Sequence, residues 1–464
     1  MLSTITVTSL DDNTTANGQV TLREALQAAN NDSTVDGVTG SGADTIVFAS
    51  SLTSGGPATL RLNGTELAIT SVVTITGPGA SLLTINGDSD SNGSGNSRVL
   101  RIASGATAEI SGLKIANGSA SVGAGIANYG TLNLSASTLT GNVATDGGGL
   151  FVAAAGTATV TECSLVGNTA WSRGGGVHSD GSLLMQRSTV SGNTAYTNGG
   201  GISGDPNVGG SENIRISNST IANNSTGFGG GGIISWRHLE LYNTTISGNV
   251  VTSGPSPGGG IEVEGGEVVL QNTILAGNTA PNGAPGNAKD VWINAAATPT
   301  SLGYNLVGII DGSRGWVATD KTGTGSSPLL AQLGPLQNNG GPTQTMLPRA
   351  NSPAIDAGSD FAPSNQWKFD EGSGVTVADS GLSHQAGTVV GATWSSSRPS
   401  SLPSGSSLQL DGVDDYVRVP NLDSNRFTVT AWVNRDQLGS QGGVVLGSIG
   451  DGGWGVGFEA GSQP

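Results

Sequence analysis

Cysteine is almost absent from this chain, which has one, Cys163, among 464 residues. An intrachain disulfide and a zinc site built from cysteines are therefore both excluded. Aromatic residues make up 4% and charged residues 11% of the sequence, so the core must consist of small aliphatic side chains rather than large rings. Only three histidines are present and no HExxH pattern occurs, which leaves little room for a histidine-based metal site.

Basic residues are scarce as well, and the formal net charge is −16. Such an acidic chain has few basic side chains to neutralise phosphates. This argues against a nucleic-acid partner and against binding to an anionic membrane surface. No apolar run approaches the ~18 residues that cross a bilayer, so we expect no membrane span. The first residues, MLSTITVTSLDDN, lack the basic and apolar segments of a signal peptide. Either the protein is cytosolic or its native N-terminus is missing here, and we favour the second interpretation.

Glycine is abundant, with 77 residues that show no Gly-X-Y period, so collagen is excluded. Many of the glycines form triplets that alternate with a corner phrase ending in asparagine, and this asparagine recurs every 25 to 31 residues. A period near 25 residues without a helical pattern predicts one coil of a parallel β-helix. The triplets are Gly147–Gly149, Gly174–Gly176, Gly199–Gly201, Gly230–Gly232 and Gly258–Gly260, and the asparagines are Asn142, Asn168, Asn193, Asn224, Asn249 and Asn278.

Within each coil, two short runs place an apolar or small residue at every second position, as strands with one buried face require. One run follows the glycine triplet, such as VHSD at 177–180, and the other precedes the asparagine, such as LLMQRSTVSGN at 183–193. Because neighbouring coils lie about 4.8 Å apart, equivalent residues stack, and we expect the asparagines to form an amide ladder. Cys163 falls in an inward column of small residues, so we interpret it as a buried side chain rather than a nucleophile.

Residues 20–30, VTLREALQAAN, are the one convincing helical stretch. Leu22, Ala25 and Leu26 share a face, and Thr21 with Glu24 predicts a capping box at the helix start. A solenoid must cover its open ends, so we expect this helix to cap the first coil.

Three stretches resemble bacterial surface proteins. VTLREALQAAN is similar to the N-terminal Cys-Ser-Leu-Arg-Glu-Ala region of surface β-helix proteins, with Val20 and Thr21 in place of Cys and Ser. The glycine and asparagine phrases resemble the repeats of polymorphic outer-membrane proteins, without their usual phenylalanine, and of pectate-lyase-like β-helices. Residues 301–359 resemble the choice-of-anchor Q segment that ends many such β-helices.

From Trp367 the chain changes to aromatic residues and strict alternation. The phrases FDEGSG, DGVDDYV and FTVTAWV resemble a laminin-G-like, concanavalin-type jelly-roll domain over residues 367–464. Such domains are usually longer, so we expect this one to be truncated. Together, the resemblances imply a protein that is secreted or held at a bacterial cell surface.

The predicted fold is all-β. It consists of a right-handed parallel β-helix of the pectate-lyase-like kind, with a short N-terminal capping helix, and a partial antiparallel β jelly-roll domain. The expected segments are an N-terminal cap with its helix at 1–50, the β-helix at 51–310, a β-helix tail and linker at 311–366, and the truncated jelly-roll at 367–464.

Candidate chemistry lies in two outward columns that follow the glycine triplets. Asp180 and Asp205 fall on neighbouring coils beside His178, and paired carboxylates can act as acid and base on a glycosidic bond. Such a pair can also hold calcium, and a third interpretation is an ordinary solvated sheet face. The same columns carry Trp236, Glu262 and Glu264, and Arg237 follows nearby on the same face but outside the columns. These four residues are a candidate ligand-binding set, in which the tryptophan could stack on a sugar.

A second acidic cluster, Asp411, Asp414 and Asp415 in LDGVDDYV, is a candidate calcium site, because clustered carboxylates in a loop suit oxygen ligation. The alternative is a turn, for which Asp-Gly is a strong signal. Calcium is the one cofactor that these residues suggest.

We therefore expect a non-catalytic, adhesin-like surface protein, in which a β-helix stalk presents a jelly-roll module that binds glycan or protein. Its partner would be an extracellular polysaccharide, or a glycoprotein on a host or neighbouring cell. One alternative is a polysaccharide lyase or glycoside hydrolase that acts along the outer β-helix face. Another is a purely structural spacer.

Overall fold

The computed structural model describes residues 3–93, 95–204, 213–254, 258–280 and 290–359. Beyond these it describes residues 367, 369, 371–378, 386–396, 406–410, 415–418, 443–447 and 455–458. The chain divides into two compact units, Met1–Ser359 and Asp360–Pro464.

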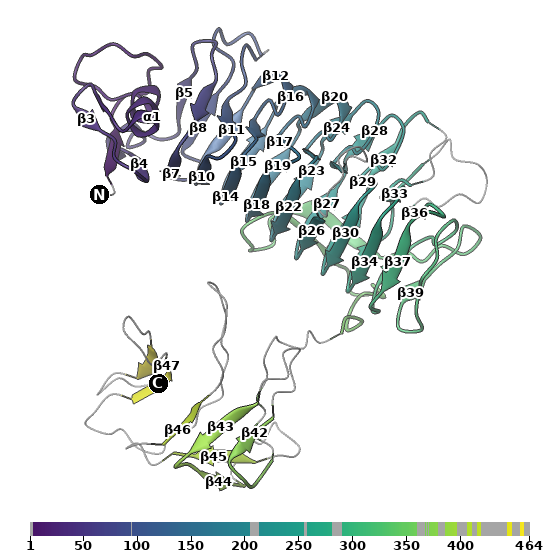
Figure 1. Cartoon of the computed structure of the whole chain (residues 1–464). Helices are drawn as coiled ribbons and strands as arrows, with labels where there is room; N and C mark the ends of the chain where they lie inside the picture. Colours follow the sequence, from purple (N-terminus) through teal and green to yellow (C-terminus); the bar gives the residue numbers. More distant parts are fainter. Residues whose placement is uncertain are drawn as a thin grey trace. The chain divides into compact units, whose positions relative to one another are not determined.

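The first unit is a solenoid whose coils follow one another along a single axis (Figure 1). Each complete coil adds one strand to each of four sheets, here numbered 1 to 4 in the order in which a coil visits them. Strands of neighbouring coils pair in parallel, as in sheet 2, where β18 pairs with β14 and β22. Sheets 1 to 4 contain 9, 11, 11 and 6 strands.

The strands of each sheet have the following bounds. Sheet 1 contains β6 (Leu67–Ile69), β9 (Leu100–Ile102), β13 (Ile126–Asn128), β17 (Leu150–Val152), β21 (Val177–Ser179), β25 (Ile202–Gly204), β29 (Ile233–Ser235), β33 (Ile261–Val263) and β36 (Val291–Ile293). Sheet 2 contains β1 (Thr4–Val7), β4 (Asp44–Phe48), β7 (Val72–Thr76), β10 (Thr107–Ser111), β14 (Thr131–Ser135), β18 (Thr157–Thr161), β22 (Ser182–Gln186), β26 (Asn213–Ser217), β30 (His238–Tyr242), β34 (Glu267–Gln271) and β37 (Thr298–Ser301). Sheet 3 contains β5 (Ala58–Arg61), β8 (Leu83–Asn86), β11 (Lys114–Ala116), β15 (Thr138–Thr140), β19 (Ser164–Val166), β23 (Thr189–Ser191), β27 (Thr220–Ala222), β31 (Thr245–Ser247), β35 (Ile274–Leu275), β38 (Leu306–Val307) and β39 (Lys321–Thr322). Sheet 4 contains β12 (Ser119–Val122), β16 (Val143–Asp146), β20 (Thr169–Arg173), β24 (Thr194–Ala195), β28 (Ser225–Thr226) and β32 (Val250–Val251). Sheet 2 therefore begins with strands inside residues 1–50, and sheet 3 ends with a strand inside residues 311–366.

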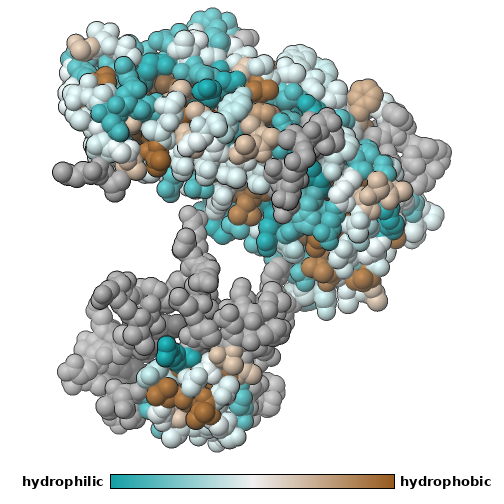
Figure 2. All heavy atoms as spheres, viewed as in Figure 1, coloured by the Kyte–Doolittle hydropathy of each residue, from teal (hydrophilic) through white to brown (hydrophobic). Residues whose placement is uncertain are grey.

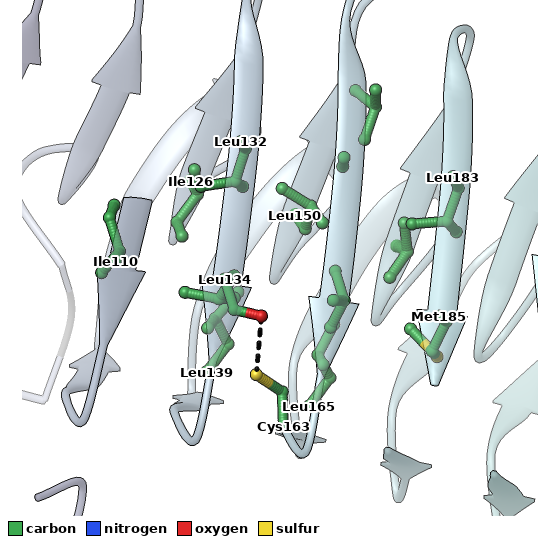
Figure 3. Packing of buried hydrophobic residues seen from close by; sticks show 14 of the residues in the cluster. Ile110, Ile126, Leu132, Leu134, Leu139, Leu150, Cys163, Leu165, Leu183 and Met185 are labelled. Atoms are coloured by element: carbon green, nitrogen blue, oxygen red, sulfur yellow. Dashed lines mark hydrogen bonds between the residues drawn. The ribbon is translucent and has the colours of Figure 1, made fainter. Parts of the chain in front are cut away.

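The core is built from inward residues that stack coil on coil (Figure 3). Register pairs Val160 with Met185 in sheet 2 and Leu165 with Val190 in sheet 3, and all four are buried. Cys163 lies among them, fully buried, with its Sγ 3.5 Å from the carbonyl oxygen of Leu134. Burial raises the pKa of the Cys163 thiol to about 12, so the thiol stays protonated near neutral pH. The interpretation of Cys163 as a small buried side chain is confirmed.

The corner between sheets 3 and 4 carries a continuous asparagine ladder. From Asn168 to Asn278, each amide oxygen accepts hydrogen bonds from the backbone N–H and the side-chain Nδ2 of the asparagine one coil earlier, at 2.8–3.1 Å. Its own Nδ2 donates to a backbone carbonyl and to the next asparagine, as Asn193 does to Leu165 and Asn224. The amide oxygen of Asn142, the first of the row, accepts from the backbone N–H of Gly118 at 2.8 Å. At the far end, Asn278 donates from both nitrogens to Oδ1 of Asp290 at 2.9 Å.

The glycine triplets are tied to this ladder by packing. In the triplet of residues 174–176, the first glycine has φ +67°, a conformation that side chains rarely adopt. A Cβ on Gly176, the third, would lie 2.8 Å from the carbonyl oxygen of Gly201 and 3.1 Å from Nδ2 of Asn193. The recurring glycines therefore make room for the neighbouring coil and for the buried amides.

One end of the solenoid is covered by α1 (Leu22–Asn31), as predicted (Figure 1). Thr21 and Glu24 form the expected capping box, and the apolar face of the helix is buried. Arg23 binds Asp12 with two 2.7 Å contacts and donates to the carbonyl oxygens of Thr65 and Glu66. The Leu-Arg-Glu-Ala stretch thus ties the capping helix to the first coils.

Smaller elements surround the solenoid: the hairpin of β2 (Thr34–Val35) with β3 (Val38–Thr39), the 3-10 turn η1 (Ser50–Leu52), and the hairpin of β40 (Leu333–Gln337) with β41 (Thr345–Pro348). The β40–β41 hairpin runs back along the outer side of sheet 3, where Oγ1 of Thr189 donates to the carbonyl oxygen of Gln344 at 2.6 Å. Ser359 similarly donates its backbone N–H to Asn272 at 2.8 Å. The end of this unit therefore folds over earlier coils.

The described strands of the second unit pair antiparallel. β43 (Gly387–Val390) lies between β42 (Thr376–Val377) and β46 (Tyr416–Arg418), β44 (Thr393–Ser395) pairs with β45 (Ser407–Gln409), and β47 (Gly443–Gly447) pairs with β48 (Gly455–Phe458). The described secondary structure of this unit therefore consists of antiparallel β-strands, and its assignment to a jelly-roll stays a prediction.

Candidate functional site

The two outward columns of sheet 1 differ in their access to solvent. The first column, at the second position after each triplet, was expected to face solvent, and that expectation is wrong: His178 is 1% exposed, and Phe151, Ser203, Ile234 and Glu262 are also buried. The glycine turns that lead from sheet 4 into sheet 1 cover it. An added Cβ on Gly199, for instance, would lie 2.8 Å from the Cβ of Ser203. Alternation alone cannot reveal such a cover, because the cover comes from a neighbouring turn.

Two stacked rings lie in this buried column, and a third, from the half-buried Tyr129, is tilted against them. The rings of Tyr129 and Phe151 have centroids 6.0 Å apart, and those of Phe151 and His178 are stacked at 5.8 Å. The guanidinium of Arg101 lies 5.9 Å from the centroid of Tyr129. The imidazole of His178 is thus packed as one member of an aromatic column.

Asp180 lies beside the edge of that column, in the second outward column, and is partly exposed. Its Oδ1 is 3.1 Å from Nε2 of His178. Partial burial acts to raise the pKa of the Asp180 carboxyl, but the hydrogen bond and charge of His178, with the charges of Arg173 and Arg237, outweigh it and hold the pKa below its usual value. Arg173 also pairs with Asp146 at 3.1 Å. The structure therefore brings Asp180 and His178 into contact, within range of the charges of Arg173 and Arg237, whereas Asp205 lies outside the described residues.

Ser203, one coil further on, pairs in register with His178. The carboxylate of Asp180, the imidazole of His178 and the hydroxyl of Ser203 therefore follow one another in the order of a nucleophilic triad. Ser203, like His178, lies beneath the glycine turns and is 0% exposed. A substrate carbonyl has no access to that hydroxyl in this conformation, so the arrangement does not support nucleophilic catalysis.

The predicted ligand-binding set is mostly engaged within the chain. Oε2 of Glu262 accepts the backbone N–H of Gly230 at 3.1 Å, and Oε2 of Glu264 accepts from Nδ2 of Asn294 at 2.8 Å. Arg237 is buried, and its backbone N–H and carbonyl both bind Oγ of Ser235. Trp236, the one aromatic member of the set, is partly exposed.

The predicted calcium cluster cannot be placed in full. Asp411 and Asp414 lie outside the described residues, and Asp415 directly precedes β46. Within the part of the chain that the structure describes, three or more His, Cys, Asp or Glu side chains do not gather in a way that would hold a metal ion. Calcium stays a prediction.

Sequence reasoning missed three exposed aromatic residues on sheet 4 and its adjoining turn. Trp171 is 56%, Tyr196 53% and Phe228 51% exposed, and the rings of Trp171 and Tyr196 are stacked with centroids 4.7 Å apart. The signal was present, since Trp171 and Tyr196 each follow an inward alanine at the same place in successive repeats. These rings lie on or beside the strands that precede the glycine triplets, outside the two columns that follow them.

In the described part of the chain, no helix is long and apolar enough to cross a membrane.

Residues 122–294 match the family model described as "Right handed beta helix region". With the parallel register of the four sheets, this match confirms the predicted fold class: an all-β chain with a right-handed parallel β-helix and one capping helix. A solved structure, ORF18 of Geobacillus virus E2, is similar at 12% identity with a TM-score of 0.32, covering 95% of this chain and 82% of the other. No curated protein matches the chain.

Proposed function

We propose that this chain is a non-catalytic, adhesin-like protein, secreted or displayed at a cell surface, whose β-helix is a rigid stalk. The observation that supports this most is how the candidate carboxylates are held. Asp180 contacts His178, and Glu262 and Glu264 accept hydrogen bonds from within the β-helix. A general acid near neutral pH needs a raised pKa, whereas that of Asp180 is lowered.

In this proposal, residues 367–464 form the module that binds a glycan or a protein. The support is the sequence resemblance to laminin-G-like domains, with Asp411, Asp414 and Asp415 as the calcium ligands. The partner is an extracellular polysaccharide or a glycoprotein on a host or neighbouring cell.

A depolymerisation assay tests the proposal. The purified chain, with and without calcium, is incubated with a panel of neutral and acidic polysaccharides, and new reducing ends and unsaturated products are followed. We expect no product above a heat-inactivated control. Product that disappears in Asp180→Asn, while the variant keeps its melting temperature, would contradict a non-catalytic role.

A polysaccharide lyase or glycoside hydrolase is the second candidate. One observation favours it: the charges of Arg173 and Arg237 act on Asp180 and help to lower the pKa of its carboxyl, and a lyase needs a basic group beside its acids. It predicts that Asp180→Asn and Asp205→Asn abolish turnover without unfolding the chain. Glu109→Gln, which changes an exposed carboxylate on β10, is the matched control and should leave turnover unchanged.

A further inference from the structure

The outer side of sheet 4 presents aromatic rings to solvent in successive coils. Ala170 and Ala195 pair in register and point into the core, so the next residues, Trp171 and Tyr196, leave the sheet on its outer side. Their rings stack with an interplanar angle of 26°. One coil further on, Gly227 follows the inward Thr226, and the adjacent Phe228 is exposed. We call Thr145, Trp171, Tyr196, Phe228 and Thr252 the sheet 4 strip.

Exposure of these rings is notable because the chain has so few aromatic residues, 4% of the total. Elsewhere in the first unit, Phe151 is buried and its ring lies tilted against that of the half-buried Tyr129. Hydrophobic residues on the face drawn in Figure 2 lie in small separate groups among hydrophilic and neutral ones. A broad apolar patch is what usually marks a protein–protein interface, and the described residues of the face in Figure 2 do not form one.

The surroundings of the rings are hydroxyl-rich and carry little charge. The coils on either side place Thr145 and Thr252 at exposed outer positions, and Thr169, Thr194 and Ser225 lie along the same strands. In the strands of sheet 4, Asp146 and Arg173 are the charged residues, and they pair with each other at 3.1 Å. The strip therefore offers ring surfaces and hydroxyl groups without a net charge.

We propose that the sheet 4 strip binds a neutral polysaccharide. The net charge of −16 repels polyanions, and the strip holds no unpaired charge that would attract one. Aromatic rings supply apolar contact for the C–H faces of sugars, while hydroxyl groups supply hydrogen bonds. Because coils repeat about every 4.8 Å, comparable contacts recur along the axis, which suits an extended chain of repeating units. This inference goes beyond the proposed function, since it assigns glycan binding to the β-helix itself rather than to residues 367–464.

Affinity electrophoresis of the full chain tests the inference, with hydroxyethyl cellulose, galactomannan or dextran in the gel and polygalacturonate as the anionic comparison. We expect retardation in at least one neutral gel and none in polygalacturonate. The double variant Trp171→Ala/Tyr196→Ala should weaken that binding at least about tenfold, because two stacking rings are lost. Tyr304→Ala, which removes a comparably exposed ring outside sheet 4, is the matched control and should bind as the wild type does.

Two results would overturn the inference: no retardation in any neutral gel, or retardation that survives the double variant. In the second case the glycan binds elsewhere, and the adhesin-like function would stand without the strip. Depolymerisation of the gel polysaccharide would contradict the non-catalytic function instead, so the two failures can be told apart. Unchanged melting temperatures of the variants would confirm that loss of binding is not loss of fold.

Discussion

The corner between sheets 3 and 4 carries asparagine in six successive coils, whereas the corner between sheets 2 and 3 carries Ser137, Cys163, Ser188, Ser219, Thr244 and Thr273. In both corners, a buried side chain can accept a backbone N–H from the coil before it, as Asn193 does from Asn168 and Ser188 does from Cys163. The difference lies in what the side chain donates to. Ser188 donates to the carbonyl of Gln186 in its own coil, while Asn193 also donates to Asn224 in the next coil.

The side-chain amide of Asn193 therefore joins three coils by hydrogen bonds, whereas the hydroxyl of Ser188 joins two. Asn193 accepts two hydrogen bonds from Asn168 and donates to Leu165 and Asn224, so the same side chain is bonded on both sides. We therefore expect that removing one asparagine lowers the free energy of unfolding more than removing one residue of the corner between sheets 2 and 3.

Asn193→Leu should have the largest effect. It leaves buried donors and acceptors without partners on both neighbouring coils, and each such group costs about 1–3 kcal/mol. We expect the free energy of unfolding to fall by about 4 kcal/mol or more, with loss of hydrogen-exchange protection in the adjacent coils. Asn133→Leu, at an exposed position of β14, is the control and should change stability by about 0.5 kcal/mol or less. Equal melting temperatures for the two variants would refute the importance of the ladder.

Gly176→Ala should come next, because it pushes a methyl group against the same corner. The new Cβ would lie 2.8 Å from the carbonyl oxygen of Gly201, 2.9 Å from Cγ1 of Val190 and 3.1 Å from Nδ2 of Asn193. We expect a loss of about 2–3 kcal/mol by urea unfolding, as for overpacked cores. Gly55→Ala, where nothing lies within 4 Å of the added Cβ, is the matched control. A loss of similar size in both variants would assign the effect to backbone conformation rather than to crowding.

Ser188→Ala should cost less, and this is the direct comparison with Asn193. The variant leaves the N–H of Cys163 and the carbonyl of Gln186 without the hydroxyl. We expect a loss of about 1–2 kcal/mol in urea unfolding, since fewer groups are left unpaired. If Ser188→Ala cost as much as Asn193→Leu, the distinction between the two corners would be lost.

Ala136→Gly should have the smallest effect, in the opposite direction. Ala136 lies in the corner between sheets 2 and 3 with φ 45°, a conformation that is strained for a residue with a side chain. Gly112 occupies the equivalent position in the preceding coil, with φ 64°. Relief of strain is partly offset by the greater freedom of glycine in the unfolded chain, so we expect a gain of up to about 1 kcal/mol. A lower melting temperature would show that the alanine methyl makes a contact that outweighs the strain.

Much of the solenoid can be predicted from the sequence, because its contacts repeat. Val160, Met185 and Ile216 occupy one inward column, and the period near 25 residues is enough to align them. The capping helix is predictable for a local reason, since Thr21 and Glu24 lie within one turn.

The candidate site was harder to predict, because its environment depends on parts of the chain that do not follow the alternation. His178 points away from the core, as expected, yet the glycine turns bury it. The return of residues 329–359 over sheet 3 likewise buries Thr189, which alternation would leave exposed. Trp171 and Tyr196 were within reach of sequence reasoning, but their exposure becomes meaningful only once their rings are known to stack.

The asparagine ladder also has a direction. From Asn142 to Asn278, every side-chain Nδ2 donates one of its hydrogens toward the later coil. The last of these hydrogen bonds is accepted by Asp290. An ionised carboxylate accepts but has no hydrogen to hand on. Further coils could therefore be inserted upstream of Asp290 and join the ladder, but a coil placed downstream of it could not continue the same row of bonds. One acidic side chain thus marks where the row of asparagine bonds ends, although β36, β37 and β38 continue three of the sheets beyond it. The number of coils in that row is therefore a property that insertion, rather than extension, can change.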